Sequence, residues 1–287
     1  MSDKMKELGI RTFSGLILIA VFSGAVLFSR WSFGALLLAI LVGCQWEFYR
    51  ICRRGGVSPQ SFTGLICGIA LFAVNFIIFR QFGDGGIADY AAGNAVLILL
   101  LYIVVLLPSI FICELARKSD NPIANIAATV TGVVYAAVPV SLLLYIPLLL
   151  GGGEWSGWMM LGFVLIVWAN DVFAYLVGCT FGKHRMCERI SPKKSWEGFF
   201  GGVAGAIAVG LLVGRLLGGS LPVWGGLAAV TAVTGVAGDF VESMFKRSVG
   251  IKDSGAMLPG HGGWLDRFDA MLISVPFVFV YLLIVCN

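Results

Sequence analysis

Residues 243–269 read SMFKRSVGIKDSGAMLPGHGGWLDRFD, and they lie between two apolar segments, 221–243 and 269–286. Each apolar segment is long enough to cross a bilayer as a helix, which needs about 20 residues. The stretch between them holds four basic residues, three aspartates, a histidine and a glycine pair. Charge of this density at a membrane boundary is costly unless it binds something. We therefore predict transmembrane helices that end in a polar site.

The composition of the whole chain also indicates a membrane protein. Its 287 residues are 59% hydrophobic and 13% charged, with a mean hydropathy of +0.93. Soluble domains are about half apolar and a quarter charged. The seven cysteines form no C-x-x-C pair, so neither a disulfide framework nor a zinc site is expected.

Apolar stretches of spanning length recur along the sequence, and they predict an all-α polytopic membrane protein with about nine transmembrane helices. The nine expected spans are 11–29, 31–51, 62–80, 94–113, 126–150, 157–180, 198–217, 221–243 and 269–286. We expect the first span to be retained as a membrane helix, because no small-x-small cleavage site follows it. Residues 1–287 are expected to form a single transmembrane domain, with N-terminal helices in 1–120 and the helices that carry the catalytic site in 121–287.

The distribution of basic residues predicts the orientation. With a cytoplasmic N-terminus, all of the 20 lysines and arginines except Arg30, Arg80 and Arg215 fall in cytoplasmic segments. Such a bias is the usual topology signal of membrane proteins. The stretch 243–269 and the loop 181–197 then face the cytoplasm, where nucleotides are found.

Several carboxylates lie in the cytoplasmic half of the predicted membrane region. Asp171 is roughly 13 Å and Asp239 roughly 10 Å below the cytoplasmic surface, at 1.5 Å rise per residue. Asp266 and Asp269 are three residues apart and share one face at the start of the last helix. Carboxylates from separate helices are suitable ligands for Mg²⁺ beside a phosphate. We therefore predict a magnesium site.

Each acid also has a simpler explanation. Asp239 or Asp269 could be neutralised by Lys246 or Arg267, and Glu242 could pair with Lys246 four residues later. For any single acid, neutralisation by a nearby cation explains the sequence as well as metal binding does. For the acids as a group, neutralisation explains it less well.

A second polar group precedes the span 198–217. Ser195 follows Lys193 and Lys194, and it is suited both to capping the next helix and to forming an anion site with the two lysines. His261 titrates near neutral pH, and we favour a positioning role for it over proton transfer.

The polar positions resemble the signature of a known family. The run is Ser243-x-Phe245-Lys246-Arg247, Lys252-Asp253, Pro259-x-His261-Gly262-Gly263 and Asp266-Arg267-x-Asp269. It resembles that of phosphatidate cytidylyltransferases, also called CDP-diacylglycerol synthases. Upstream, Asn170-Asp171 and Ser191-Pro192-x-Lys194-Ser195-x-Glu197-Gly198 also resemble the family. One departure is Trp264, where the family usually has an aliphatic residue.

The resemblance implies transfer of CMP from CTP to phosphatidate, dependent on Mg²⁺, in a nine-helix fold that is often dimeric. The expected partners are therefore CTP, phosphatidate, membrane lipids and a possible homodimer, with no nucleic acid. A bacterial inner membrane is the expected location, with the active site facing the cytoplasm. The implied metal ligands are Asp239, Asp266, Asp269 and Asp171. The implied catalytic residues are Lys246, Asp266, Asp269 and His261. The implied substrate-binding residues are Lys193, Lys194, Ser195, Ser243, Arg247, Lys252, Asp253, Gly262, Gly263 and Arg267.

Other membrane functions fit the sequence less well. A CTP-dependent kinase of a membrane alcohol shares the chemistry class, whereas a CDP-alcohol phosphotransferase would carry a D-G-x-x-A-R pattern that this chain lacks. A transporter would spread polar residues to both leaflets. A non-catalytic scaffold would leave the charges of 243–269 unexplained.

Overall fold

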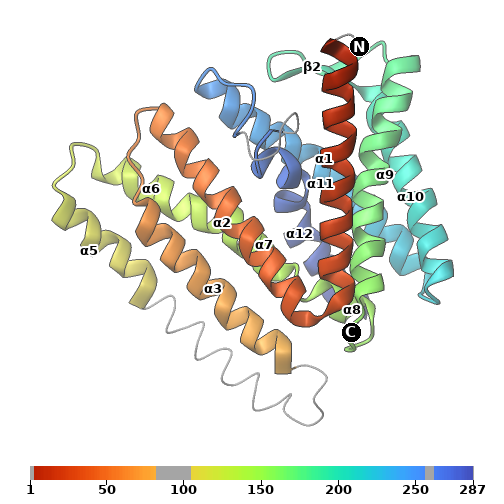
Figure 1. The fold of residues 1–287 in the computed structure, drawn as a ribbon, viewed down its shortest axis with the longest axis horizontal. Coiled ribbons are helices and arrows are strands. Elements are labelled where there is room, and N and C mark those ends of the chain that lie inside the picture. Colours follow the sequence, from red (N-terminus) through yellow and green to blue (C-terminus); the bar gives the residue numbers. More distant parts are fainter. Residues whose placement is uncertain (1–2, 82–104, 256–261, 287) are drawn as a thin grey trace. The chain divides into compact units, whose positions relative to one another are not determined.

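The computed structural model describes residues 3–81, 105–255 and 262–286, and it is built from helices with one short hairpin (Figure 1). The N-terminal helices are α1 (Asp3–Phe28), α2 (Arg30–Arg54), α3 (Ser61–Gln81), α5 (Leu107–Arg117) and α6 (Pro122–Gly132). The π-helical turn η2 (Val133–Ala137), α7 (Val138–Leu142) and α8 (Ile146–Leu150) follow. The later helices are α9 (Gly157–Phe181), α10 (Trp196–Leu216), α11 (Leu221–Ser248) and α12 (Leu265–Cys286). The helical fold class is confirmed.

The hairpin was not predicted. Strands β1 (Arg185–Cys187) and β2 (Ser191–Ser195) pair antiparallel between α9 and α10. A segment this short, rich in lysine and polar residues, has no apolar alternation that could indicate a strand. The hairpin is closed by a bond from the Trp196 N–H to the His184 carbonyl (2.9 Å).

Within the described residues, seven helical segments are long and apolar enough to cross a membrane. They are Arg30–Arg54, Ser61–Arg80, Pro122–Leu150, Gly157–Phe181, Trp196–Leu216, Leu221–Ser248 and Leu265–Cys286. These match seven of the nine expected spans. The expected span 11–29 lies in α1, whose shorter apolar part is Gly15–Phe28. The expected span 94–113 falls largely outside the described residues.

The chain groups into two compact units. Unit 1 comprises Met1–Leu144 and Ser248–Phe268, and unit 2 comprises Tyr145–Arg247 and Asp269–Asn287. The expected single transmembrane domain, with halves at 1–120 and 121–287, stays a prediction.

In unit 1, α2 packs against α3 and α6, and polar side chains join the three helices. Gln45 donates to the Tyr49 hydroxyl and to the Gly64 carbonyl, both at 2.8 Å. Tyr49 in turn donates to the Thr129 carbonyl at 2.8 Å. Both hydrogens of the Gln45 amide nitrogen therefore find acceptors inside the protein, as a donor away from water requires.

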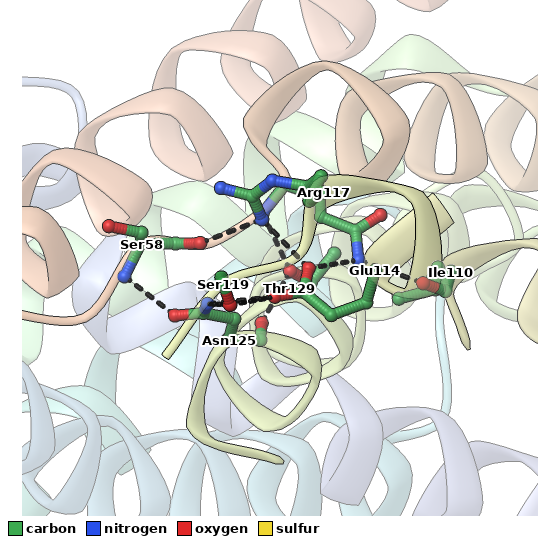
Figure 2. A network of polar contacts seen from close by, with 8 residues as sticks. Ser58, Ile110, Glu114, Arg117, Ser119, Asn125 and Thr129 are labelled. Atoms are coloured by element: carbon green, nitrogen blue, oxygen red, sulfur yellow. Dashed lines mark hydrogen bonds and ion pairs between the residues drawn. The ribbon is translucent and has the colours of Figure 1, made fainter. Parts of the chain in front are cut away.

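A second polar network surrounds the carboxylate of Glu114, which is 2% exposed (Figure 2). Four side chains donate to this carboxylate at 2.7–2.8 Å: Gln60, Arg117, Ser119 and Asn125. Burial acts to raise the pKa of Glu114, but hydrogen bonds from Ser119, Asn125 and Gln60, together with Arg117, outweigh it and lower the pKa to about 2. The network joins α5 to α6 and to the start of α3.

The Glu114→Gln variant is expected to unfold more easily. The amide removes the charge that four donors surround, so we expect the free energy of unfolding to fall by about 2 kcal/mol at pH 7. Because folding lowers the pKa of Glu114 below its ordinary value of 4.5 to about 2, its stabilisation is complete above pH 4.5 and is lost as the pH falls toward 2. Urea titrations in detergent at several pH values measure this difference.

The matched control for this prediction is Glu154→Gln, which changes an exposed glutamate. Its free energy of unfolding should stay within about 0.5 kcal/mol of the wild type at every pH. A difference between Glu114→Gln and the wild type that did not shrink in acid would contradict the assignment.

In unit 2, α9 and α10 pack closely because glycines face the neighbouring helix. A Cβ at Gly202 would lie within 3.0 Å of Asn170 and Ala174, and one at Gly198 would lie 2.8 Å from the Ala174 carbonyl oxygen. A Cβ at Gly205 would overlap the ring of Phe173. Small residues at this spacing let helix backbones approach in lipid. The glycines of α10 therefore serve packing within the chain.

Candidate functional site

The acid–lysine cluster of unit 2 comprises Asp171 from α9, Lys194 from β2, Asp239 from α11 and Asp269 from α12. The Lys194 ammonium lies 2.6 Å from an Asp239 carboxylate oxygen. The Asp269 carboxylate interacts electrostatically with Asp239, Asp171 and Lys194. Charges from four elements that are distant in sequence are thus brought together.

Local sequence features hold this cluster in place. Gly238 precedes Asp239, and a Cβ there would lie 2.5 Å from the Asp269 carbonyl oxygen, so the glycine allows α11 to approach α12. Ser243, one turn after Asp239, donates to its second carboxylate oxygen at 3.2 Å. Lys194 also lies over the ring of Phe240, at 4.7 Å from the centroid. Cation and ring contact in this way adds to the ion pair.

The acid–lysine cluster holds three carboxylates and the Lys194 ammonium group. The side chains of Lys194 and Asp239 are 26% and 39% exposed. Carboxylates that repel one another favour binding of a further cation.

The simpler explanation for Asp239 is corrected in one respect. The sequence offered Lys246 or Arg267 as its neutralising partner, whereas the structure pairs Asp239 with Lys194. Lys246 is instead buried against Glu242, four residues before it. The predicted Glu242–Lys246 pair is therefore confirmed, and it follows from the helical period.

In unit 1, Asp266 organises the loop before α12. One oxygen of its carboxylate accepts from the Gly263 N–H at 2.7 Å, and from the Ser254 N–H and hydroxyl at 3.0 Å each. Gly262 has a φ of +76°, which favours glycine, and its missing side chain leaves room for Asp266. The glycine pair was predicted to let the backbone approach a ligand, and here it lets the backbone approach a carboxylate of the protein.

Glu47 of α2 is the residue of this region that the sequence reading did not assign. Its carboxylate accepts from the Ser254 hydroxyl at 2.7 Å and from the Leu265 N–H at 3.0 Å. A buried acid inside an apolar span was the available signal, because such an acid needs a partner. Its partners are more than 200 residues away, so the spacing of local motifs could not identify them. Trp264, the departure from the family pattern, packs against Gly43 of α2, the helix that also carries Glu47.

The loop 181–197 holds the predicted lysines and serine. Ser195 accepts from the Gly198 N–H at 3.2 Å, so its predicted role as helix cap is confirmed. The side chain of Lys193 is exposed, while its carbonyl accepts from Arg185 at 3.1 Å. Glu197 accepts from the backbone of Lys183 at 3.1 Å. The loop is thus held by its backbone, which leaves the Lys193 side chain toward solvent.

The other predicted residues are placed as follows. Arg247, Lys252, Asp253 and Arg267 are exposed. His261 lies outside the described residues. Among the residues that the structure describes, no three histidine, cysteine or acidic side chains lie close enough to hold a metal ion by themselves.

Comparison with known proteins identifies the family of this chain. A model of the cytidylyltransferase family matches residues 9–285. The chain belongs to the cytidylyltransferase family. The family resemblance seen in the sequence is therefore confirmed over nearly the whole chain.

Curated relatives of this cytidylyltransferase-family chain carry a more specific name. This chain is 41% identical over 160 residues to the phosphatidate cytidylyltransferase of Mycobacterium bovis. The alignment covers 55% of this chain and 51% of the relative. The chain is 45% identical over 121 residues to the phosphatidate cytidylyltransferase of Staphylococcus epidermidis, covering 42% of this chain and 46% of the relative. The chain spans about half the length of the curated relatives it matches.

Proposed function

We propose that the chain transfers CMP from CTP to phosphatidate, forming CDP-diacylglycerol and pyrophosphate. The observation that carries this proposal is the acid–lysine cluster, which gathers Asp171, Lys194, Asp239 and Asp269 in a protein of the cytidylyltransferase family. The bacterial relatives named as phosphatidate cytidylyltransferases support the choice of substrates.

The reaction suits a site without a protein nucleophile. A phosphate oxygen of phosphatidate attacks the α-phosphorus of CTP, and a new P–O bond forms. The bond from the α-phosphorus to the oxygen that bridges to the β-phosphate breaks, and pyrophosphate leaves with that electron pair. The protein has to align two polyanions and stabilise the departing charge, which is a task for cations and backbone N–H groups.

Mg²⁺ is the cofactor that the cluster fits best. The donors are carboxylate oxygens, which hard cations prefer, and the repulsion of Asp269 by Asp239 and Asp171 favours a cation between them. We propose Asp171, Asp239 and Asp269 as ligands, with Asp266 as a fourth. When bound, Mg²⁺ neutralises phosphate charge. Since these side chains are not close enough to hold the ion alone, substrate phosphates would complete the set.

The remaining roles follow from charge and position. Lys246, Asp266, Asp269 and His261 are proposed as the catalytic residues. The proposed substrate-binding residues are Lys193, Lys194, Ser195, Ser243, Arg247, Lys252, Asp253, Gly262, Gly263 and Arg267. We further propose a cytoplasmic N-terminus, an active site facing the cytoplasm of a bacterial inner membrane, and a homodimer.

The Lys193→Ala variant tests the role of the loop 181–197. The Lys193 side chain is exposed and its backbone carbonyl still accepts from Arg185 in the variant, so the substitution should leave the hairpin intact. We expect the apparent KM for CTP or phosphatidate to rise about tenfold with little change in kcat, which corresponds to one lost contact with a phosphate. Steady-state kinetics in detergent micelles, with each substrate varied in turn, measure this.

The control in the same loop is Lys183→Ala, an exposed lysine to which no binding role is given. Its kinetics should match those of the wild type. Unchanged KM values for both substrates in Lys193→Ala would remove this lysine from the binding site.

The proposed function itself is tested with the purified chain, labelled CTP and phosphatidate, with and without Mg²⁺. We expect CDP-diacylglycerol and pyrophosphate in equal amounts, and no product after chelation of the metal. A chain that makes no CDP-diacylglycerol under any metal condition is not this enzyme. Formation of CDP and a phosphorylated lipid alcohol would indicate a CTP-dependent kinase instead.

A further inference from the structure

We propose that Glu47 is a positioning residue for the reaction, acting on the site through Ser254 and the first turn of α12. This inference rests on the proposed function. Glu47 lies within α2, and its side chain is buried at 5% exposure. Its partners, Ser254 and Leu265, lie within the signature stretch 243–269, before and after the residues 256–261 that the structure does not describe.

The Glu47 carboxylate accepts from the first N–H group of α12, as a helix cap does. The Leu265 N–H is the first of α12, and an N–H at this position has no partner within its own helix. Glu47 accepts from it at 3.0 Å, and a negative charge here also interacts favourably with the helix dipole. The first residue of α12 is thereby bonded to α2.

Two glycines, Gly255 and Gly263, leave room for the Glu47 carboxylate against the backbone before α12. A Cβ at either Gly255 or Gly263 would overlap the carboxylate oxygens of Glu47. Any other residue at these positions would therefore push Glu47 or the loop away. Both glycines lie within unit 1, as Glu47 does, and they flank the loop on its two sides.

A chain of contacts connects Glu47 to a proposed site residue. The Ser254 hydroxyl lies 2.7 Å from Glu47 and 3.0 Å from the same Asp266 oxygen that accepts from the Gly263 N–H. Ser254 is 4% exposed, so water does not compete for its hydroxyl. Within the described ranges no lysine, arginine or histidine pairs with Glu47. The loop is thus what satisfies this buried acid, and the acid in return orients Asp266.

The experiment compares Glu47→Gln, Ser254→Ala and the double variant with the wild type. Residues that orient metal ligands typically contribute 10- to 100-fold, so we expect kcat to fall about 10- to 100-fold in Glu47→Gln. The Mg²⁺ concentration for half-maximal activity should rise, while the KM for phosphatidate stays within about twofold. Because the two residues act through the same series of hydrogen bonds to Asp266, the kcat of the double variant should be no lower than that of the slower single variant.

Amide hydrogen exchange supplies a measurement that does not depend on turnover. Peptides that cover Ser254 and Gly263–Asp266 should exchange at least about tenfold faster in Glu47→Gln, with exchange in unit 2 unchanged. Glu114→Gln is the matched control: it makes the same change at another buried acid of unit 1, and it should lower stability while kcat of the folded protein stays within about twofold.

The outcomes separate this inference from the proposed function. A wild type without product would reject the function, while the exchange data would still decide whether Glu47 holds the loop. Wild-type kcat and wild-type loop exchange in Glu47→Gln would overturn the inference, as would multiplicative losses in the double variant. If Glu47→Gln does not fold, Ser254→Ala decides alone: an unchanged kcat and Mg²⁺ dependence would overturn the proposal.

Discussion

Asp269→Asn should lose at least about 100-fold in kcat while the protein remains folded. Asparagine has the same shape but no charge, and Asp269 lies among Asp171, Asp239 and Lys194. Removal of one negative charge from a group of like charges relieves repulsion, so the free energy of unfolding should not fall. Single-turnover assays with labelled CTP, together with thermal unfolding in the same detergent, measure both quantities.

Asp120→Asn is the control for this variant, because it makes the same change at an exposed aspartate outside the site. It should have wild-type kcat. A nearly normal rate in Asp269→Asn would remove Asp269 from the metal site and leave the cluster with a structural role.

Lys194→Met should reduce both stability and activity. Asp239 would lose its ion-pair partner and would face Asp269 without a counter-charge. Because both members of the pair are partly exposed, we expect a loss of about 1 kcal/mol in the free energy of unfolding. If Lys194 also binds a substrate phosphate, kcat/KM should fall about 100-fold.

The double variant Lys194→Met/Asp239→Asn separates these two effects. It removes both charges of the pair, so the free energy of unfolding should recover to near the wild-type value, whereas activity should stay low. Recovery of activity together with stability would mean that Lys194 only neutralises Asp239 and touches no substrate, and that Asp239 is not a metal ligand. Mg²⁺ should stabilise Lys194→Met more than the wild type, since the uncompensated acids favour a cation.

Features that depend on neighbours in sequence could be predicted. Hydropathy indicated the helical segments, and the helical period indicated the Glu242–Lys246 pair. Ser195 was recognised as a cap because a cap and the helix that it begins are adjacent. In each case the cause acts over a few residues, so one sequence is enough to show it.

Features that depend on tertiary contacts could not be predicted in the same way. The partner of Asp239 is Lys194, from a hairpin 45 residues earlier, and local spacing favoured Lys246 instead. No role was predicted for Glu47, because its partners lie 207 and 218 residues further along the chain. A carboxylate in a span indicates that a partner exists, but it does not identify that partner.

The distance along the chain between Glu47 and Leu265 has a consequence for biosynthesis. The 218 residues between them take about 10–40 s to translate at 5–20 residues per second. During that interval α2 has been made, while the hydroxyl and N–H groups that satisfy its acid have not. A nascent chain therefore carries an unsatisfied carboxylate through most of its synthesis. Substitution of Glu47 by a neutral residue should accordingly ease early membrane insertion, even though it impairs the finished protein.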